Sequence, residues 1–353
     1  MLDMQHEIAT PLDASDLATY HALQQDAVWF ESIGHWSSFR GEKAAEALNG
    51  LITNDVSLLS PGEGQYAAAL SPKGKVLADM LVIRIDESTF QMTLLRAAAD
   101  SWLALARKYV NPRLAKIADE SDRYVTWMLF GSRAVEAMAA LGGAKASSEG
   151  LGDVMVAMLS DWPAWHHASW NLGEASIRLI RAPILGNIPG FILMADVADA
   201  EIVREHLRDS NLLLANRTVW NVARVESGRP AWGLDMDENT IPQEANLDAL
   251  DAISFTKGCY TGQETVARLH FRGHVNKQLR GLRASAPMMY GAVISDNMGK
   301  VVGDVRSSVI SPTLGAIAIA MIRREVAIGD TVLIGENDQQ ISARVVALPF
   351  SDE

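Results

Sequence analysis

Short runs of alternating apolar and polar residues dominate the first hundred positions. Gln65–Leu70 and Val76–Ile85 alternate with the period of strands, and the turn residues at 71–75 between them predict a β-hairpin. Thr89–Leu95 continues the pattern, and Val28–Trp36 is expected to form one short strand that enters the first core. The start of the chain is therefore predicted to build a sheet around a hairpin.

Apolar residues at helical spacing separate these strands. Gly41–Asn49 carries alanines and a leucine at that spacing, and Asn49-Gly50 is a good helix stop. Asp100 is expected to cap a helix that ends at Tyr109, before the helix-breaking Asn111-Pro112. A helix or loop is expected over Ala14–Ala27, and further helices over Arg133–Leu141, Asp199–Leu207 and around Asn216–Val225.

Further along the chain, the mixture of predicted helices and strands first continues, and the spacing of strands and turns then changes. Further strands are predicted over Tyr124–Phe130, Val154–Leu159, Ala175–Ile180 and Phe191–Met194, with a loop over Gly142–Gly152. From Lys277 on, short strands recur between glycine-containing turns, which indicates a small barrel or jelly roll. These strands are Leu279–Arg283, Ala292–Ser295, Lys300–Val305, Gly315–Ile322, Thr331–Ile334 and Gln340–Ala347.

Composition narrows the class of protein. The chain has 353 residues, 48% of them hydrophobic, enough for two or three domains with sizeable cores. Its net charge of −12 disfavours direct nucleic-acid binding, which depends on lysine and arginine displacing counterions. The sequence has no run that predicts a membrane span and no signal-peptide pattern, and its single cysteine predicts no intramolecular disulfide. We therefore expect a cytoplasmic protein.

The only cysteine lies in a glycine-rich run, Lys257-Gly258-Cys259-Tyr260-Thr261-Gly262-Gln263-Glu264. Glycine lets a ligand or partner approach the backbone closely. Lys257 and Arg268 are nearby cations, and cations lower the pKa of a thiol and make it more reactive. The simpler interpretation is a buried, inert cysteine in a turn before a strand.

Two carboxylates are further candidates. Glu226, in Arg224–Pro230, could accept two N–H donors side by side, or it is a solvated residue before a turn. Asp79, beside the apolar run Met80–Ile85, could be a pocket carboxylate, or it starts or edges a strand.

We predict no metal site. His166 and His167 adjoin tryptophans, but neighbours in an extended segment point to opposite faces, so a surface aromatic loop is favoured. No phosphate-binding loop, dinucleotide fingerprint or C-x-x-C motif is present. One cysteine cannot by itself hold an iron–sulfur cluster, which normally takes four protein ligands.

The run from Lys257 to Glu264, with Ala267-Arg268 and Phe271-Arg272-Gly273 after it, resembles the signature of the YgfZ family. Leu51–Asp55, Gly62–Tyr66 and Gly74–Asp79 resemble the N-terminal half of the glycine-cleavage T-protein. The similarity touches most of the chain in order, from about residue 30 to the C-terminal barrel.

This resemblance implies an α+β fold of the T-protein type. Two interleaved α+β units with antiparallel sheets of ferredoxin-like or Greek-key kind are expected over residues 1–275, and a C-terminal β-barrel over residues 276–353. The two units and the barrel are expected to surround a central folate channel.

The resemblance also implies functional residues. Glu226 corresponds to a residue that binds the pterin of tetrahydrofolate, and Asp79 to the carboxylate beside the reactive folate nitrogen. Cys259 is the family's signature cysteine. Lys257, Gly258, Tyr260 and Arg268 are expected to help bind the cofactor.

The resemblance implies a tetrahydrofolate-binding protein that maintains iron–sulfur proteins, including enzymes that thiolate tRNA. Two alternatives stay open at this stage. The first is a folate-dependent aminomethyltransferase, with Asp79 as its working group. The second is a non-enzymatic module that senses folate or docks a partner, for which the tryptophan-rich loop at 162–170 is a candidate contact. The sequence does not decide whether a reaction is catalysed, and a monomer agrees with it.

Overall fold

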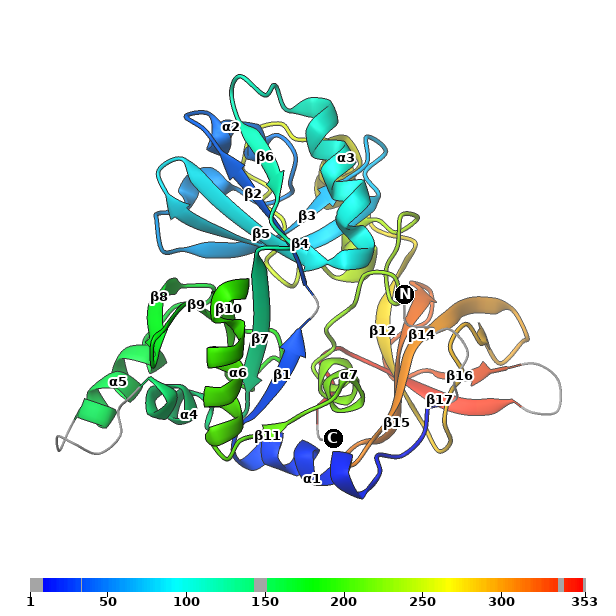
Figure 1. The fold of residues 1–353 in the computed structure, drawn as a ribbon. Helices are drawn as coiled ribbons and strands as arrows, with labels where there is room; N and C mark the ends of the chain where they lie inside the picture. Colours follow the sequence, from blue (N-terminus) through cyan, green and yellow to red (C-terminus); the bar gives the residue numbers. More distant parts are fainter. Residues whose placement is uncertain (1–8, 33, 143–150, 336–339, 352–353) are drawn as a thin grey trace.

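Two β-sheets with their helices and one closed barrel meet around a common centre (Figure 1). The computed structural model describes residues 9–351, with gaps at residue 33 and at 143–150 and 336–339. Within this part of the chain, no helix is long and apolar enough to cross a membrane. The expected α+β fold with two mixed units and a C-terminal barrel is confirmed.

The first sheet has the strand order β11-β1-β7-β10-β9-β8 and is antiparallel except where β1 pairs with β11. Its strands are β1 (Val28–Ser32), β7 (Tyr124–Phe130), β8 (His167–Leu172), β9 (Ala175–Arg181), β10 (Gly190–Asp196) and β11 (Leu213–Leu214). Three helices pack on this sheet and share a hydrophobic core with it: α4 (Ala134–Leu141), α5 (Leu151–Ser160) and α6 (Ala200–Asp209).

The second sheet is antiparallel throughout, in the order β3-β4-β5-β2-β6. Its strands are β2 (Gly34–Arg40), β3 (Gly64–Leu70), β4 (Val76–Asp86), β5 (Thr89–Leu95) and β6 (Lys116–Asp119). The predicted hairpin is present as β3 and β4. The helices α2 (Ala44–Asn49) and α3 (Ala99–Tyr109) cover one face of this sheet and enclose a core with it.

The two units interleave, because the chain begins the first sheet, builds the whole second sheet and then returns. The prediction of one strand over Val28–Trp36 is therefore wrong. Val28–Ser32 pairs with β7 in the first sheet, whereas Gly34–Arg40 pairs with β5 in the second. The segment 28–36 mixes apolar residues with Glu31, Ser32 and His35, and nothing in this local pattern marks the point at which the chain changes sheets.

Residues 154–159 form a helix and not the predicted strand. They lie within α5, where Met155, Val156 and Leu159 face the core of the first sheet at helical spacing. A short apolar run cannot be assigned to helix or strand by its periodicity alone, and here packing against α4 decides. The predicted loop over Gly142–Gly152 falls mostly outside the described residues, and its last two residues already belong to α5.

Two further local differences concern a cap and a turn. Asp100 lies in the first turn of α3, but the N-cap is Ala98, so the predicted capping role is wrong. The glycine-rich run leads into the helix α8 (Gln263–Arg272) and not into a strand. The strands β6 and β8 were not predicted from the sequence. In the part of the chain that the structure describes, short 3-10 helices lie in the connections at Val56–Leu58, Arg96–Ala98, Val197–Asp199 and Pro242–Ala245.

The barrel closes in the order β12-β15-β14-β13-β16-β17. Its strands are β12 (Lys277–Ala284), β13 (Val293–Ser295), β14 (Val301–Ser311), β15 (Gly315–Arg323), β16 (Thr331–Ile334) and β17 (Ile341–Val346). The barrel begins two residues after the predicted domain boundary at 275/276, which itself stays a prediction.

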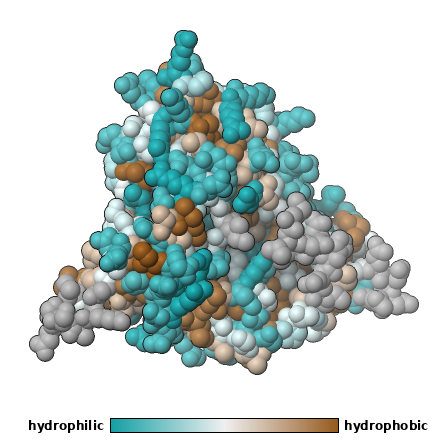
Figure 2. Space-filling model, viewed as in Figure 1, coloured by the Kyte–Doolittle hydropathy of each residue, from teal (hydrophilic) through white to brown (hydrophobic). Residues whose placement is uncertain are grey.

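One hydrophobic core is shared by both sheets, the barrel and the helices α1 (Ala14–Gln25) and α7 (Arg217–Glu226). Phe30 of the first sheet, Leu81 of the second and Ile317 of the barrel belong to the same cluster of buried side chains. The outer surface is mainly hydrophilic in the view of Figure 2, with small hydrophobic areas between polar residues.

A buried ion pair joins α7 to the barrel inside this core. The guanidinium of Arg224 donates to the Asp235 carboxylate at 2.8 Å and to the Ser307 hydroxyl of β14 at 2.9 Å. The side chains of Arg224 and Asp235 are 5% and 0% exposed. Asp235 also accepts the backbone N–H of Ala231, so the pair fixes the loop after α7 as well.

Substitution of Arg224 by methionine should destabilise the protein by about 3–5 kcal/mol, because Asp235 would keep a buried charge without its cation. Urea unfolding measures this difference. The matched control is Lys300→Met, which breaks an ion pair whose side chains are 58% and 44% exposed, and which should cost less than about 1 kcal/mol. Equal effects of the two substitutions would contradict the structural importance of the buried pair.

Candidate functional site

Asp79 lies in the middle of β4, on the face that looks toward the shared core. The β3–β4 register places Asp79 opposite Ala68, so Tyr66, two residues before Ala68, shares its face of the sheet. The Tyr66 hydroxyl donates to Asp79 Oδ2 at 2.6 Å. The hairpin predicted from the sequence thus positions this pair.

Residues from two other segments complete the surroundings of Tyr66. The guanidinium of Arg229, which follows α7, lies 3.9 Å from the centre of the Tyr66 ring. Trp165, from the segment before β8, stacks on Tyr66 with 6.4 Å between the ring centres. We call Tyr66, Asp79, Trp165 and Arg229 the central cluster.

One oxygen of the central cluster has no hydrogen-bond partner. Asp79 Oδ1 is buried and unpaired, whereas Oδ2 accepts from Tyr66. A buried polar atom without a partner costs roughly 1–3 kcal/mol. Of the twelve such side-chain atoms among the described residues, Asp79 Oδ1 is the one that belongs to the central cluster. The position of Asp79 Oδ1 therefore points to a donor that a ligand would bring.

Burial also changes the protonation of this pair. Burial raises the pKa of Asp79 above its ordinary value, although the Tyr66 hydrogen bond and the positive charge of Arg229 act in the opposite direction. Burial and the nearby Asp79 carboxylate hold the pKa of Tyr66 well above its ordinary value, so Tyr66 remains a donor. Titratable groups perturbed in this way are common at functional sites.

Glu226, the predicted pterin-binding residue, lies elsewhere at the junction of three elements. It is the last residue of α7, and its Oε1 accepts from the Tyr20 hydroxyl of α1 at 2.8 Å and from Ser311 Oγ of β14 at 2.5 Å. Burial raises the pKa of Tyr20 to about 12, which keeps this hydroxyl protonated. These partners are not members of the central cluster.

Lys257 anchors the loop that carries the single cysteine. Its ammonium donates to the backbone carbonyls of Asn49, Ile52 and Asn54, at 2.8, 2.8 and 2.6 Å. Three acceptors match the three N–H donors of an ammonium, and they lie at the end of α2 and just after it. Burial lowers the pKa of Lys257 to about 8.

The other predicted residues of this run differ in exposure. Cys259 is a free, exposed thiol, so the interpretation as a buried, inert cysteine is wrong. Gly258 beside it has open space where a side chain would stand. Tyr260 is buried, with the Lys257 ammonium 5.1 Å from its ring, and burial raises the pKa of Tyr260 to about 12. Arg268 lies exposed on α8.

The cysteine loop also packs against the hairpin that carries Asp79. Gly262 has a φ of +81° and a side chain there would meet the Ser71 carbonyl, so only glycine fits this approach. Thr265 of α8 donates to the Lys73 carbonyl at 3.3 Å. The structure therefore connects the two sequence motifs through the tip of one hairpin.

Sequence reasoning missed three of the four members of the central cluster. Tyr66 and Arg229 stand inside segments quoted for other reasons, and Trp165 belongs to the loop interpreted as a surface patch. No local pattern brings these three segments together. The described residues contain no group of three or more candidate metal ligands.

The substitution Asp79→Asn should stabilise the protein at neutral and alkaline pH. The folded-state pKa of Asp79 is raised, so wild type loses stability as pH rises from the unfolded value near 4 through the folded value. The variant should gain about 1.4 kcal/mol for each unit of that shift, and the gain should vanish at lower pH. Urea unfolding between pH 4 and 8 measures it.

Asp86→Asn is the control with the opposite sign. Hydrogen bonds from Ser88 lower the pKa of this exposed turn carboxylate, so its removal should slightly destabilise the protein above the unfolded pKa. A stability difference for Asp79→Asn that does not depend on pH would show that the carboxyl group titrates normally.

Comparison with known proteins places this fold and sequence in a family. The model of the GCVT N-terminal domain matches residues 21–257, and that of the glycine cleavage T-protein C-terminal barrel domain matches residues 277–352. An aminomethyltransferase T of the glycine cleavage system from Bartonella henselae has a similar structure, with a TM-score of 0.78 and 20% identity. The match covers 98% of this chain and 91% of that chain.

Curated relatives carry two different names. An aminomethyltransferase of Ralstonia pickettii is 28% identical, over 95% of this chain and 89% of the relative. A tRNA-modifying protein YgfZ of an Enterobacter species is 30% identical over 72% of each chain, and one of Yersinia enterocolitica is 25% identical over 97% of each. On these matches the chain belongs to the glycine cleavage T-protein family, as a relative of the YgfZ proteins.

Proposed function

We propose that this protein binds tetrahydrofolate, or a derivative of it, and supports the assembly or repair of iron–sulfur proteins and thereby tRNA modification. In this proposal the ligand binds at the central cluster and Cys259 is the working thiol. The protein acts in the cytoplasm, with iron–sulfur proteins as its clients. The match to the T-protein domains supports a folate-related function. The YgfZ relatives, which are named as tRNA-modifying proteins, support a link to tRNA modification.

The observation that carries the folate assignment is the buried, unpartnered Oδ1 of Asp79. A pterin ring presents N–H donors along one edge, and a carboxylate is the natural acceptor for such an edge. Trp165, which stacks on Tyr66, places a second aromatic ring near that acceptor. Bound folate would supply a nitrogen that carries one-carbon units.

The chain itself contributes orientation and charge control. Tyr66 holds Asp79 Oδ2, which leaves Oδ1 as the free acceptor. Arg229 favours the ionised form of Asp79 and opposes the effect of burial. Together these contacts fix one carboxylate in a water-poor setting, where a hydrogen bond to a ligand is strong.

Glu226 is the second candidate for ligand binding. Its carboxylate is held by Tyr20 and Ser311, so a ligand would have to compete with these partners. We therefore propose that the hydrogen-bond donors of the ligand contact Asp79, and we compare the effect of substituting Glu226 on ligand affinity. The proposal also includes the other predicted residues around Cys259, namely Lys257, Gly258, Tyr260 and Arg268. Lys257 anchors the loop that carries Cys259.

The exposure of the Cys259 thiol supports a direct role of this residue in contacts with client iron–sulfur proteins. An exposed cysteine on an anchored, glycine-flanked loop is accessible to the surface of another protein. Because one thiol cannot hold a cluster by itself, any cluster chemistry would be shared with the client.

An aminomethyltransferase is the second candidate function. The aminomethyltransferase name of the Ralstonia relative and the position of Asp79 favour it. In that case Asp79 would assist proton transfer at the folate nitrogen, and Cys259 would be dispensable.

Wild type should bind tetrahydrofolate with a dissociation constant in the micromolar range, roughly −8 kcal/mol, in anaerobic calorimetry. Asp79→Asn should weaken binding by roughly 10–100-fold, the worth of a hydrogen bond to a charged group. Glu226→Gln is measured in parallel, and Glu325→Gln, on the barrel surface, is the control.

If only Glu226→Gln weakened binding, the ligand would lie at the α1–α7–barrel junction and our placement would be wrong. Absence of binding to wild type would remove the folate assignment altogether.

Cys259→Ala should fail to restore the activity of iron–sulfur enzymes in a strain that lacks this protein, while its affinity for tetrahydrofolate stays that of wild type. The thiol is exposed and forms no disulfide, so a folding defect is not expected. Cys259→Ser tests whether a hydroxyl suffices. Full restoration by Cys259→Ala, with methylene-tetrahydrofolate formed from an aminomethyl donor, would favour the transferase instead.

A further inference from the structure

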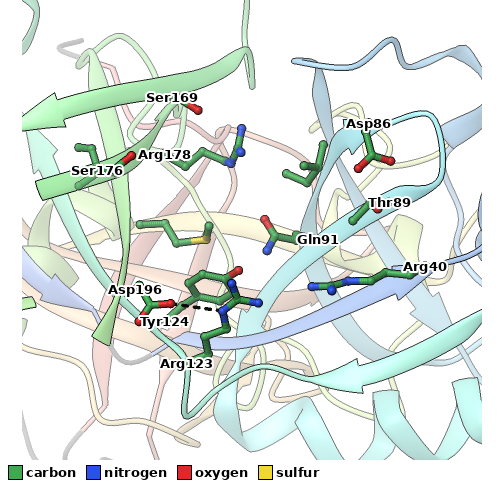
Figure 3. A pocket seen from close by; sticks show the side chains of 13 residues that line it. Arg40, Asp86, Thr89, Gln91, Arg123, Tyr124, Ser169, Ser176, Arg178 and Asp196 are labelled. Carbon is green, nitrogen blue, oxygen red and sulfur yellow. Dashed lines mark hydrogen bonds and ion pairs between the residues drawn. The ribbon is translucent and has the colours of Figure 1, made fainter. Parts of the chain in front are cut away.

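A polar cavity of about 380 Å³ lies between the two sheets (Figure 3). One wall comes from β7, β8, β9 and β10 of the first sheet, and the other from β2, β4 and β5 of the second. Its size falls in the range of small-molecule sites. Thirteen residues line it: Arg40, Ile85, Asp86, Thr89, Gln91, Arg123, Tyr124, Ser169, Ser176, Ile177, Arg178, Met194 and Asp196.

This cavity is separate from the central cluster. Asp79 and Ile85 are on the same face of β4 but six residues apart, which corresponds to about 20 Å along a strand. The cavity lining contains none of the four residues of the central cluster. A ligand here would therefore contact a different set of side chains.

The charged groups of the wall are not equivalent. Arg40 and Arg123 both pair with the Glu120 carboxylate, at 2.7 and 3.4 Å, and Arg123 also pairs with Asp196 at 3.3 Å. Arg178 has no carboxylate partner among the described residues, and its Nε is buried without a hydrogen bond. The cavity thus holds one partly buried guanidinium whose charge is not compensated.

A neutral histidine positions this guanidinium. Arg178 Nη1 donates to His167 Nδ1 at 3.0 Å, and His167 Nε2 donates to the Arg84 carbonyl at 3.0 Å. Burial and the nearby Arg178 lower the pKa of His167 to about 4, so the imidazole stays an acceptor at neutral pH. His167 therefore orients Arg178 without neutralising it.

The strand registers place polar groups next to Arg178. Ser169 of β8 lies directly opposite Arg178 of β9, so both side chains project from the same face, and Met194 of β10 is its partner on the other side. In Figure 3 Ser169 and Arg178 lie next to each other at one side of the cavity, with Gln91 of the facing sheet across from them.

The acidic residues of the wall are held by neighbouring groups. Asp86 accepts from the backbone and hydroxyl of Ser88, and Asp196 accepts from the Ala198 N–H and from Arg123. These contacts keep the pKa of both carboxyl groups below the ordinary value, so both are ionised. An anion would therefore bind at Arg178, because Asp86 on the facing sheet would repel it and the charge of Asp196 is already paired with Arg123.

We propose that this cavity binds a small polar ligand through an oxyanion, a carboxylate or a phosphate, which pairs with Arg178 and accepts from Ser169. A planar guanidinium with free N–H donors matches either group. Filling the cavity with such a ligand would compensate a partly buried charge that has no carboxylate partner among the described residues.

Calorimetric titration with inorganic phosphate and, separately, with glutarate tests the site, at constant ionic strength kept with sodium chloride. At least one probe should bind wild type saturably, and Arg178→Met should weaken that binding at least tenfold. Phosphate alone would indicate a phosphorylated ligand, and glutarate alone a carboxylate ligand. Arg280→Met, which removes a partly buried arginine of the barrel, is the control and should bind like wild type.

Ser169→Glu provides a second test that does not depend on removing a buried group. Ser169 is exposed, and a carboxylate placed opposite Arg178 should compete with the probe and abolish its binding. Ser169→Gln, of equal size without the charge, should keep more of the affinity.

The proposal is overturned if neither probe binds wild type saturably, or if Arg178→Met binds as tightly as wild type. Asp79→Asn should leave probe binding unchanged, so a failure of the folate assignment would not affect this result.

Discussion

A single hydrophobic core, shared by two sheets and a barrel, is the constraint on which the rest of this structure depends. No unit is complete without it, because each sheet turns one face to it and the barrel adds Leu279, Val309 and Ile317. The interleaved chain path strengthens this dependence, since the first sheet is finished only after the second has been built. The buried pair of Arg224 and Asp235 adds a directional contact to an otherwise non-directional association.

The shared core also explains why Asp79 is unusual. A carboxylate on the outer face of β4 would be solvated, but this face meets the other units, so burial raises its pKa. The folded protein tolerates an unpaired Oδ1 there although it costs stability. A residue that costs stability while serving a proposed ligand would be a common compromise between stability and function.

The two sequence motifs of the family meet at the hairpin of β3 and β4. One strand of the hairpin carries Asp79, and its tip packs against Gly262 and Thr265 of the cysteine loop. Lys257 fixes the same loop to the carbonyls around the end of α2. These contacts connect the cysteine loop with the hairpin that carries Asp79.

The sequence by itself determined the features that depend on neighbouring residues. The hairpin followed from turn chemistry, the barrel from short strands between glycines, and the family from the residues around Cys259. Tertiary structure decided where one apolar run divides between two sheets, and that residues 154–159 form a helix. It also brought Arg229 and Trp165 to Tyr66, and left Arg178 without a carboxylate partner among the described residues. These outcomes depend on contacts between distant segments, and periodicity reports only which face of an element is apolar, not what will cover it.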